Sequence, residues 1–156
     1  MNVILQYLDS GDYGTPGILF VLNDAGVQVA AFTAGALPET DSRRLPPGHY
    51  RFLWHDETPN HPTGIYMILD NATDAGDEIH NGDFFGDTTK MNPATGKPYI
   101  SNVTGCTVIG QGFQILEGQF ALLNSLVALG QFNTLMNKQP FLLEVRPYGG
   151  TVSPDA

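Results

Sequence analysis

Apolar and polar residues alternate in short segments along most of this chain, and Gly, Pro, Asn and Asp separate the segments. A period of two with breakers at each end is typical of half-buried β-strands. The turn Asn23-Asp24-Ala25-Gly26 between two such segments predicts a hairpin. Strands are predicted at residues 3–8, 17–22, 27–33, 48–55, 64–70, 77–80, 112–116, 119–123 and 141–147.

One segment in the C-terminal half changes to helical spacing. Ser125 is the expected N-cap, because its hydroxyl can accept a hydrogen bond from the first turn. The apolar residues of this helix recur three or four positions apart, namely Leu126, Leu129, Phe132, Leu135 and Met136. Residues 81–102 show little periodicity and predict a long loop, which in a compact domain is usually functional or disordered.

These elements together predict a mainly β (α+β) fold. We expect a curled mixed β-sheet or a partly open barrel, with the one α-helix packed on it. A chain of 156 residues suits one domain that buries about two-thirds of its unfolded surface. Residues 1–148 are assigned to that domain and residues 149–156 to a polar C-terminal tail.

Charge and hydropathy exclude several partners. The net charge is −9 and no basic stripe exists, which argues against nucleic acid. No apolar run approaches the roughly 20 residues of a membrane-spanning helix, so membrane insertion is not expected. The first residues lack a basic region and a signal-length apolar stretch, which predicts synthesis in the cytoplasm without a signal peptide.

The single cysteine, Cys106, is the main candidate for chemistry. A lone cysteine is either a small buried side chain or a nucleophile with a neighbouring base. Gly105 permits close approach of a substrate backbone, and His80, at the end of a predicted strand, is the candidate base. The backbone N–H groups of Cys106 and Gly105 are candidates for an oxyanion hole.

Four motifs in a fixed order surround these residues. The histidine lies in Asp77-Glu78-Ile79-His80-Asn81-Gly82, and the cysteine in Gly105-Cys106-Thr107-Val108-Ile109-Gly110. Leu45-Pro46-Pro47-Gly48-His49-Tyr50 precedes them, and Asn124-Ser125-Leu126-Val127-Ala128-Leu129 follows. Over residues 14–147 this order resembles the L,D-transpeptidase catalytic domain. It resembles more closely a phage- and prophage-associated group of related domains without an assigned activity.

Two positions depart from the cell-wall transpeptidases. Those enzymes usually carry Ser or Thr three residues before the cysteine and Arg two residues after it, whereas this chain has Val103 and Val108. The missing Arg removes a side chain that shapes the acyl-donor site in that family. A shared ancestry therefore does not imply a shared substrate.

The resemblance implies roles for further residues. The imidazole of His80 would be oriented by the backbone carbonyl of Asn81 or Gly82, with Asp83, Asp87 and Ser101 as side-chain alternatives. Because the family Arg is missing, an arginine elsewhere is expected to bind the substrate, and Arg43, Arg44 and Arg51 are the candidates. The residues assigned to substrate binding are Arg51, Asp83, Ser101 and Thr104.

The function that this pattern predicts is cysteine-dependent acyl transfer or amide hydrolysis on peptidoglycan stem peptides. The alternative is a structural or accessory protein of a phage or injection particle that keeps the fold with weak or no activity. Either function would place the protein in a virion or deliver it to the periplasm or cell wall.

No metal or cofactor is expected. His55 and His61 flank the acidic pair Asp56-Glu57, but their spacing matches no zinc pattern. The acidic residues Asp70, Asp74, Asp77 and Glu78 lack the arrangement of a calcium loop, so solvated carboxylates are the expected interpretation.

Overall fold

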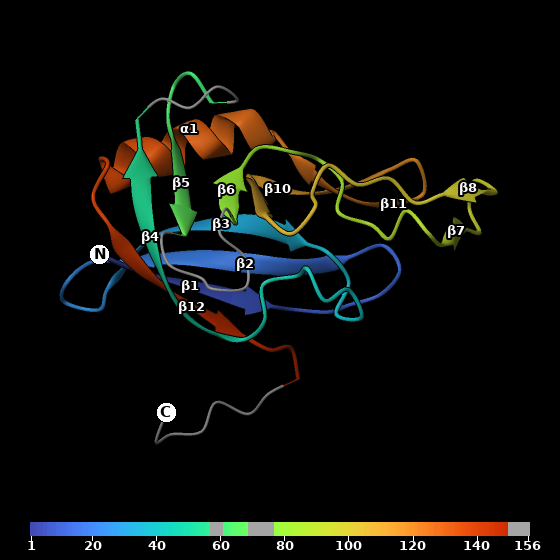
Figure 1. The fold of residues 1–156 in the computed structure, drawn as a ribbon, viewed down its shortest axis with the longest axis horizontal. Helices are drawn as coiled ribbons and strands as arrows, with labels where there is room; N and C mark the ends of the chain where they lie inside the picture. The colour runs from blue at the N-terminus through green and yellow to red at the C-terminus, as the bar shows by residue number, and fades with distance from the viewer. Residues whose placement is uncertain (57–60, 69–76, 150–156) are drawn as a thin grey trace.

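The computed structural model describes residues 1–56, 61–68 and 77–149. Eight strands close into a barrel in the order β1-β12-β4-β5-β6-β9-β3-β2 (Figure 1). All neighbours are antiparallel except the pairs β1–β12 and β6–β9. The strands are β1 (Asn2–Tyr7), β2 (Thr15–Leu22), β3 (Gln28–Ala36), β4 (Gly48–His55), β5 (Ile65–Ile68), β6 (Glu78–His80), β9 (Thr107–Gly110) and β12 (Phe141–Arg146).

The predicted mixed β fold with one helix is confirmed, and the sheet closes fully. Closure depends on β1, which pairs with β2 on one side and β12 on the other. Alternation along β1 turns Val3, Leu5 and Tyr7 into the core, where each is at most 1% exposed. The hairpin of β2 and β3 around residues 23–26 is also confirmed. The end of the predicted strand 64–70 and the tail from residue 150 lie outside the described residues.

Helix α1 (Ser125–Met136) closes one end of the barrel (Figure 1). The ring of Phe132 packs edge-to-face against Phe32, Tyr66 and Phe141, from the non-adjacent strands β3, β5 and β12. Three strands bury this large side chain, so truncation of Phe132 to Ala is expected to lower the unfolding free energy by about 3–5 kcal/mol. The helix therefore belongs to the main core.

Two details of the predicted helix are wrong. The N-cap is Asn124, in a left-handed conformation with φ 51°, because the Ser125 hydroxyl donates a hydrogen bond to the Ile109 carbonyl instead. The buried face also differs, since Leu126 is 71% exposed. Small side chains allow the helix to approach the barrel closely, so the buried residues are Ser125, Ala128, Phe132 and Met136.

Polar side chains close the opposite end of the barrel. The Tyr7 hydroxyl donates to the Leu45 carbonyl over 2.8 Å, and the Arg44 guanidinium lies 4.5 Å from the Tyr7 ring centroid. Arg44 also donates to the Thr15 hydroxyl over 3.2 Å. Arg44 is 7% exposed, so its charge is held within the structure by these contacts.

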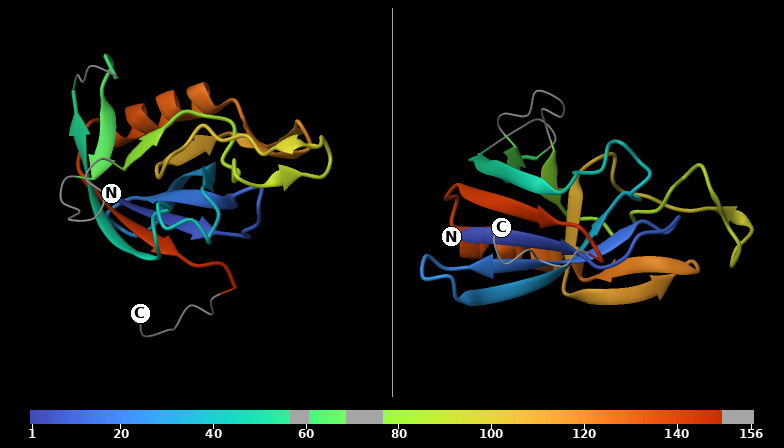
Figure 2. Two further views of the ribbon diagram at one scale, coloured as in Figure 1. Left: turned by 45° about the vertical axis from the view of Figure 1, so that its right-hand side comes forward. Right: turned by 90° about the horizontal axis from the view of Figure 1, so that it is seen from below.

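A two-hairpin arm projects from the barrel (Figures 1 and 2). One hairpin pairs β10 (Gly112–Leu116) with β11 (Gln119–Leu123), as the alternation predicted. The other pairs β7 (Met91–Asn92) with β8 (Lys97–Pro98), so residues 81–102 are not wholly loop.

The two hairpins of the arm are joined by the Asn92 side chain. It donates a hydrogen bond to the Glu117 carbonyl over 2.9 Å and accepts one from the Ala94 N–H. Polar contacts of this kind produce no periodic pattern in the sequence, so they could not be predicted from it. Beneath the base of the arm lies a second apolar cluster of Leu37, Phe85, Val103, Val108 and Leu122.

Candidate active site

Cys106 and His80 lie on one face of two neighbouring strands. In the parallel pair β6–β9, Ile79 aligns with Thr107 and His80 with Val108. Ile79 and Thr107 are at most 2% exposed and point into the barrel. Because side chains alternate across a strand, His80 and Cys106 project from the other face, as diagonal neighbours.

The imidazole of His80 has a fixed orientation. Its Nδ1 lies 2.7 Å from the carbonyl oxygen of Asn81. A carbonyl can only accept a hydrogen bond, so Nδ1 carries a proton, and in the neutral imidazole Nε2 is the nitrogen with the free lone pair. This is one of the two carbonyl contacts that the family resemblance implies, and it leaves Nε2 in the form that a general base requires.

The backbone on both sides of the pair is constrained. Gly82 follows the histidine, and its N–H donates to the Ser125 hydroxyl over 2.9 Å. Gly105 precedes the cysteine with φ +148°, and a Cβ there would lie 3.1 Å from the Arg43 carbonyl and from Asp77 Oδ1. Only glycine fits both the conformation and the space at position 105.

The thiol of Cys106 is held in its neutral form. Burial is the main cause that raises the pKa of Cys106 from 9.0 to about 11, and the charges of Glu78 and Asp77 raise it further. Backbone hydrogen bonds at Glu78 and Cys106 act in the opposite direction. Within the described part of the chain, no hydrogen bond joins the thiol to the His80 ring. The thiol is therefore protonated in the resting protein, without a preformed thiolate–imidazolium pair.

A small polar pocket opens next to Gly105. Its volume is about 150 Å³, and it is lined on one side by the segment after β3 and on the other by the base of the arm. Two of the predicted substrate-binding residues, Ser101 and Thr104, line it together with Arg43. The Arg43 guanidinium is paired with Asp41 through contacts of 2.8 and 3.0 Å. Its lining residues Val103 and Thr104 lie two to three residues before Cys106 in the chain, which makes this pocket a candidate to hold part of a substrate.

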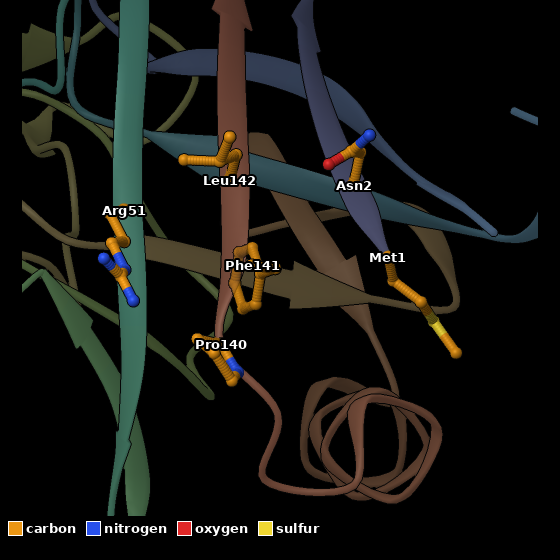
Figure 3. A pocket seen from close by; sticks show the side chains of 6 residues that line it. All are labelled: Met1, Asn2, Arg51, Pro140, Phe141 and Leu142. Carbon is orange, nitrogen blue, oxygen red and sulfur yellow. The ribbon is translucent and has the colours of Figure 1, made fainter. Parts of the chain in front are cut away.

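The other two predicted substrate-binding residues lie outside this pocket. Asp83 has an exposed side chain, while its N–H donates to Asn102 and its carbonyl accepts from Leu122. Arg51 lies on β4, separated from β9 by β5 and β6. It lines a separate hollow of about 310 Å³ with Leu142, Phe141, Pro140, Asn2 and Met1 (Figure 3).

Three residues at the site were not predicted from the sequence. Glu78 is among the groups that act on the Cys106 thiol, and His61 Nε2 lies 2.9 Å from its carboxylate. The spacing of Glu78 two residues before His80 was the available signal, because residues i and i+2 of a strand share a face. Ser125 supports Gly82 through a contact between distant segments, for which the local sequence carries no signal.

Neither a metal cluster nor a membrane-spanning helix is found among the residues that the structure describes. No group of three or more His, Cys, Asp or Glu side chains there is arranged to hold an ion. The one helix is too short for a membrane span.

Comparisons with protein-family models, with curated proteins and with solved structures found no match to this chain. The resemblance to L,D-transpeptidases therefore rests on the four sequence motifs alone.

Proposed function

We propose that the protein is a cysteine-dependent enzyme that transfers or hydrolyses acyl groups of peptidoglycan stem peptides. The observation that carries the proposal is the placement of His80 and Cys106 on one face of two parallel strands. The Asn81 carbonyl fixes the tautomer of the neutral His80 imidazole, in which Nε2 is unprotonated. The resemblance of the surrounding motifs to the L,D-transpeptidase domain supports the substrate class.

In the proposed reaction, His80 acts during the attack on the substrate. Because the thiol is protonated at rest, Nε2 takes its proton as the sulfur adds to an amide carbonyl carbon. The imidazolium then gives this proton to the departing amine as the carbon–nitrogen bond breaks, which leaves a thioester on Cys106. A second amine or a water molecule attacks the thioester and releases the thiol.

Arg43 is the arginine best placed to contact the substrate. It lines the pocket beside Gly105, whereas Arg44 is buried against Tyr7 and Arg51 faces a different hollow. Ser101 and Thr104 lie in the same pocket. A substrate carboxylate could displace Asp41 from Arg43, since a guanidinium binds carboxylates in the same bidentate geometry. Arg43 would then supply the positive charge that is missing at Val108.

The alternative is an accessory role in a phage or injection particle with little or no turnover. Two observations favour it. The thiol is half-buried and its pKa lies well above neutrality. In addition, Val103 and Val108 both pack into the second apolar cluster, where the enzymes of the family carry polar side chains.

Digestion of isolated sacculi distinguishes these functions. The purified protein is expected to change the muropeptide profile, while Cys106→Ala and His80→Ala leave it unchanged and melt within a few degrees of the wild type. An unchanged profile with the wild-type protein, together with stable association with a particle component, would overturn the enzymatic proposal. A clear fall in melting temperature for Cys106→Ala would indicate that the thiol serves packing.

A further inference from the structure

Glu78 occupies a position that the proposed reaction leaves unused. It begins β6 directly before Ile79, which pairs with Thr107, so alternation puts Glu78 on the same face as Cys106, the residue directly before β9. Its paired neighbour on β5 is Met67. Its side chain is 17% exposed. A carboxylate so little exposed keeps much of its electrostatic effect on groups beside it, because water screens it only partly.

The charge of Glu78 is itself paired. Nε2 of His61 lies 2.9 Å from Oε2 of Glu78, and the His61 side chain is 29% exposed. When His61 is protonated, the pair is neutral overall. When His61 is neutral, the carboxylate acts on the thiol with its full negative charge.

We propose that Glu78 and His61 form a charge-control pair that regulates the nucleophile. In this pair the carboxylate of Glu78 opposes loss of the thiol proton from Cys106, and protonation of His61 relieves that opposition. Both are positioning residues, because they act on the substrate only through the sulfur. The inference rests on the proposed function in taking Cys106 as the reacting group.

The other charged groups around the thiol do not reproduce this effect. Asp77 is 8% exposed, and its Oδ1 lies beside Gly105. The Arg43 guanidinium is already paired with Asp41, and Arg44 lies against Tyr7. His80 lies on the same face of β6 as Glu78.

The pair predicts a specific pH dependence. If no neighbouring group changes its charge with pH, the reactivity of a thiol falls tenfold for each pH unit below the pKa of that thiol. Imidazoles gain their proton between about pH 8 and pH 5, and protonated His61 then stabilises the thiolate. The alkylation rate of Cys106 should therefore fall by less than tenfold per unit across this range.

The test measures the rate of Cys106 alkylation by iodoacetamide from pH 5 to pH 9 by intact-protein mass spectrometry. Glu78→Gln keeps a hydrogen-bond acceptor for His61 but removes the charge. This variant is expected to react about tenfold faster at pH 8, as for a thiol pKa lower by about one unit. Glu144→Gln on β12, where Glu144 pairs with Arg146, is the matched control and should react like the wild type.

His61→Gln tests the second half of the pair. The alkylation rate of this variant should equal that of the wild type at pH 9 and be lower than that of the wild type below pH 6. It should fall tenfold for each pH unit. All rates are repeated with His80→Gln, so that titration of His80 does not contribute. An unchanged rate in Glu78→Gln, or parallel profiles for His61→Gln and wild type, would overturn the inference.

Failure of this inference and failure of the proposed function give different results. The alkylation profile needs no peptidoglycan. If the rates follow the charge pair but sacculi stay unchanged, the proposed function fails and the charge control stands. If sacculi are processed but Glu78→Gln alkylates at the wild-type rate, only the charge control fails.

Discussion

At Cys106 the surroundings of the sulfur oppose ionisation. Burial and two carboxylates raise the thiol pKa to about 11, so only a minute fraction is thiolate at neutral pH. A cysteine in this environment reacts at a useful rate only if a base removes its proton during the attack. His80, which ends the neighbouring strand β6, is the proposed base.

This requirement makes the reactivity of Cys106 depend on His80. His80→Ala is expected to slow alkylation at pH 7.5 by about tenfold or more, because the variant has no Nε2 to accept the proton. The rate is measured with iodoacetamide on the folded protein. His49→Ala, an exposed histidine on β4, is the control and should not change it. Equal rates in wild type and His80→Ala would remove His80 from the mechanism.

Val108 stands where the resemblance to L,D-transpeptidases implies an arginine. Its side chain is fully buried beside Phe85 and Leu122. Val108→Arg would bury a guanidinium without a partner, so a loss of about 3 kcal/mol or more in unfolding free energy is expected. Urea denaturation measures this loss. Val108→Ile, which adds one methylene group without a charge, is the control and should lose less than Val108→Arg, about 1–3 kcal/mol. If Val108→Arg is as stable as the wild type, the buried placement of this side chain is wrong.

At the scale of elements, the periodic strands could be predicted from sequence. Strand β4 (Gly48–His55) and the β2–β3 hairpin follow directly from alternation and turn residues. The buried face of α1 could not, because Ala128 and Ser125 are placed inward by close approach to the barrel. Hydrophobic spacing favours Leu126, which is exposed, since periodicity does not report how near the neighbouring element lies.

The Ser125 hydroxyl links three elements and should matter for both stability and reactivity. It donates to the Ile109 carbonyl and accepts from the Gly82 N–H, at 4% exposure. Ser125→Ala leaves both groups without this partner, so a loss of about 1–3 kcal/mol is expected in urea denaturation. Because Gly82 follows His80 closely, Cys106 alkylation should also slow.

The matched control is Leu126→Ala on the same helix. Leu126 is 71% exposed, so a change within about 0.5 kcal/mol is expected. A Ser125→Ala variant that loses no more stability than Leu126→Ala would mean that the hydroxyl does not hold these segments together.

At the scale of the whole molecule, closure joins segments that are far apart in the sequence. Strand β1 pairs with β12 at the opposite end of the chain, and β6 pairs with β9 across the arm. Local patterns do not encode such pairings, which explains why a partly open barrel was expected. The segments of His80 and Cys106 were expected to be adjacent in a curled sheet, and β6 does pair with β9. The placement of Arg43 and Glu78 became visible only with the closed barrel.

The central claim is that Cys106 becomes acylated by peptidoglycan stem peptides. Its most direct test is the intact mass of the protein after incubation with disaccharide peptides released from sacculi and rapid quenching in acid. The expected result is a mass increase equal to the peptide minus its leaving amine, located on Cys106, absent from Cys106→Ala and reduced in His80→Ala. A wild-type mass that stays unchanged at every time point, with the peptides unprocessed, would contradict the claim.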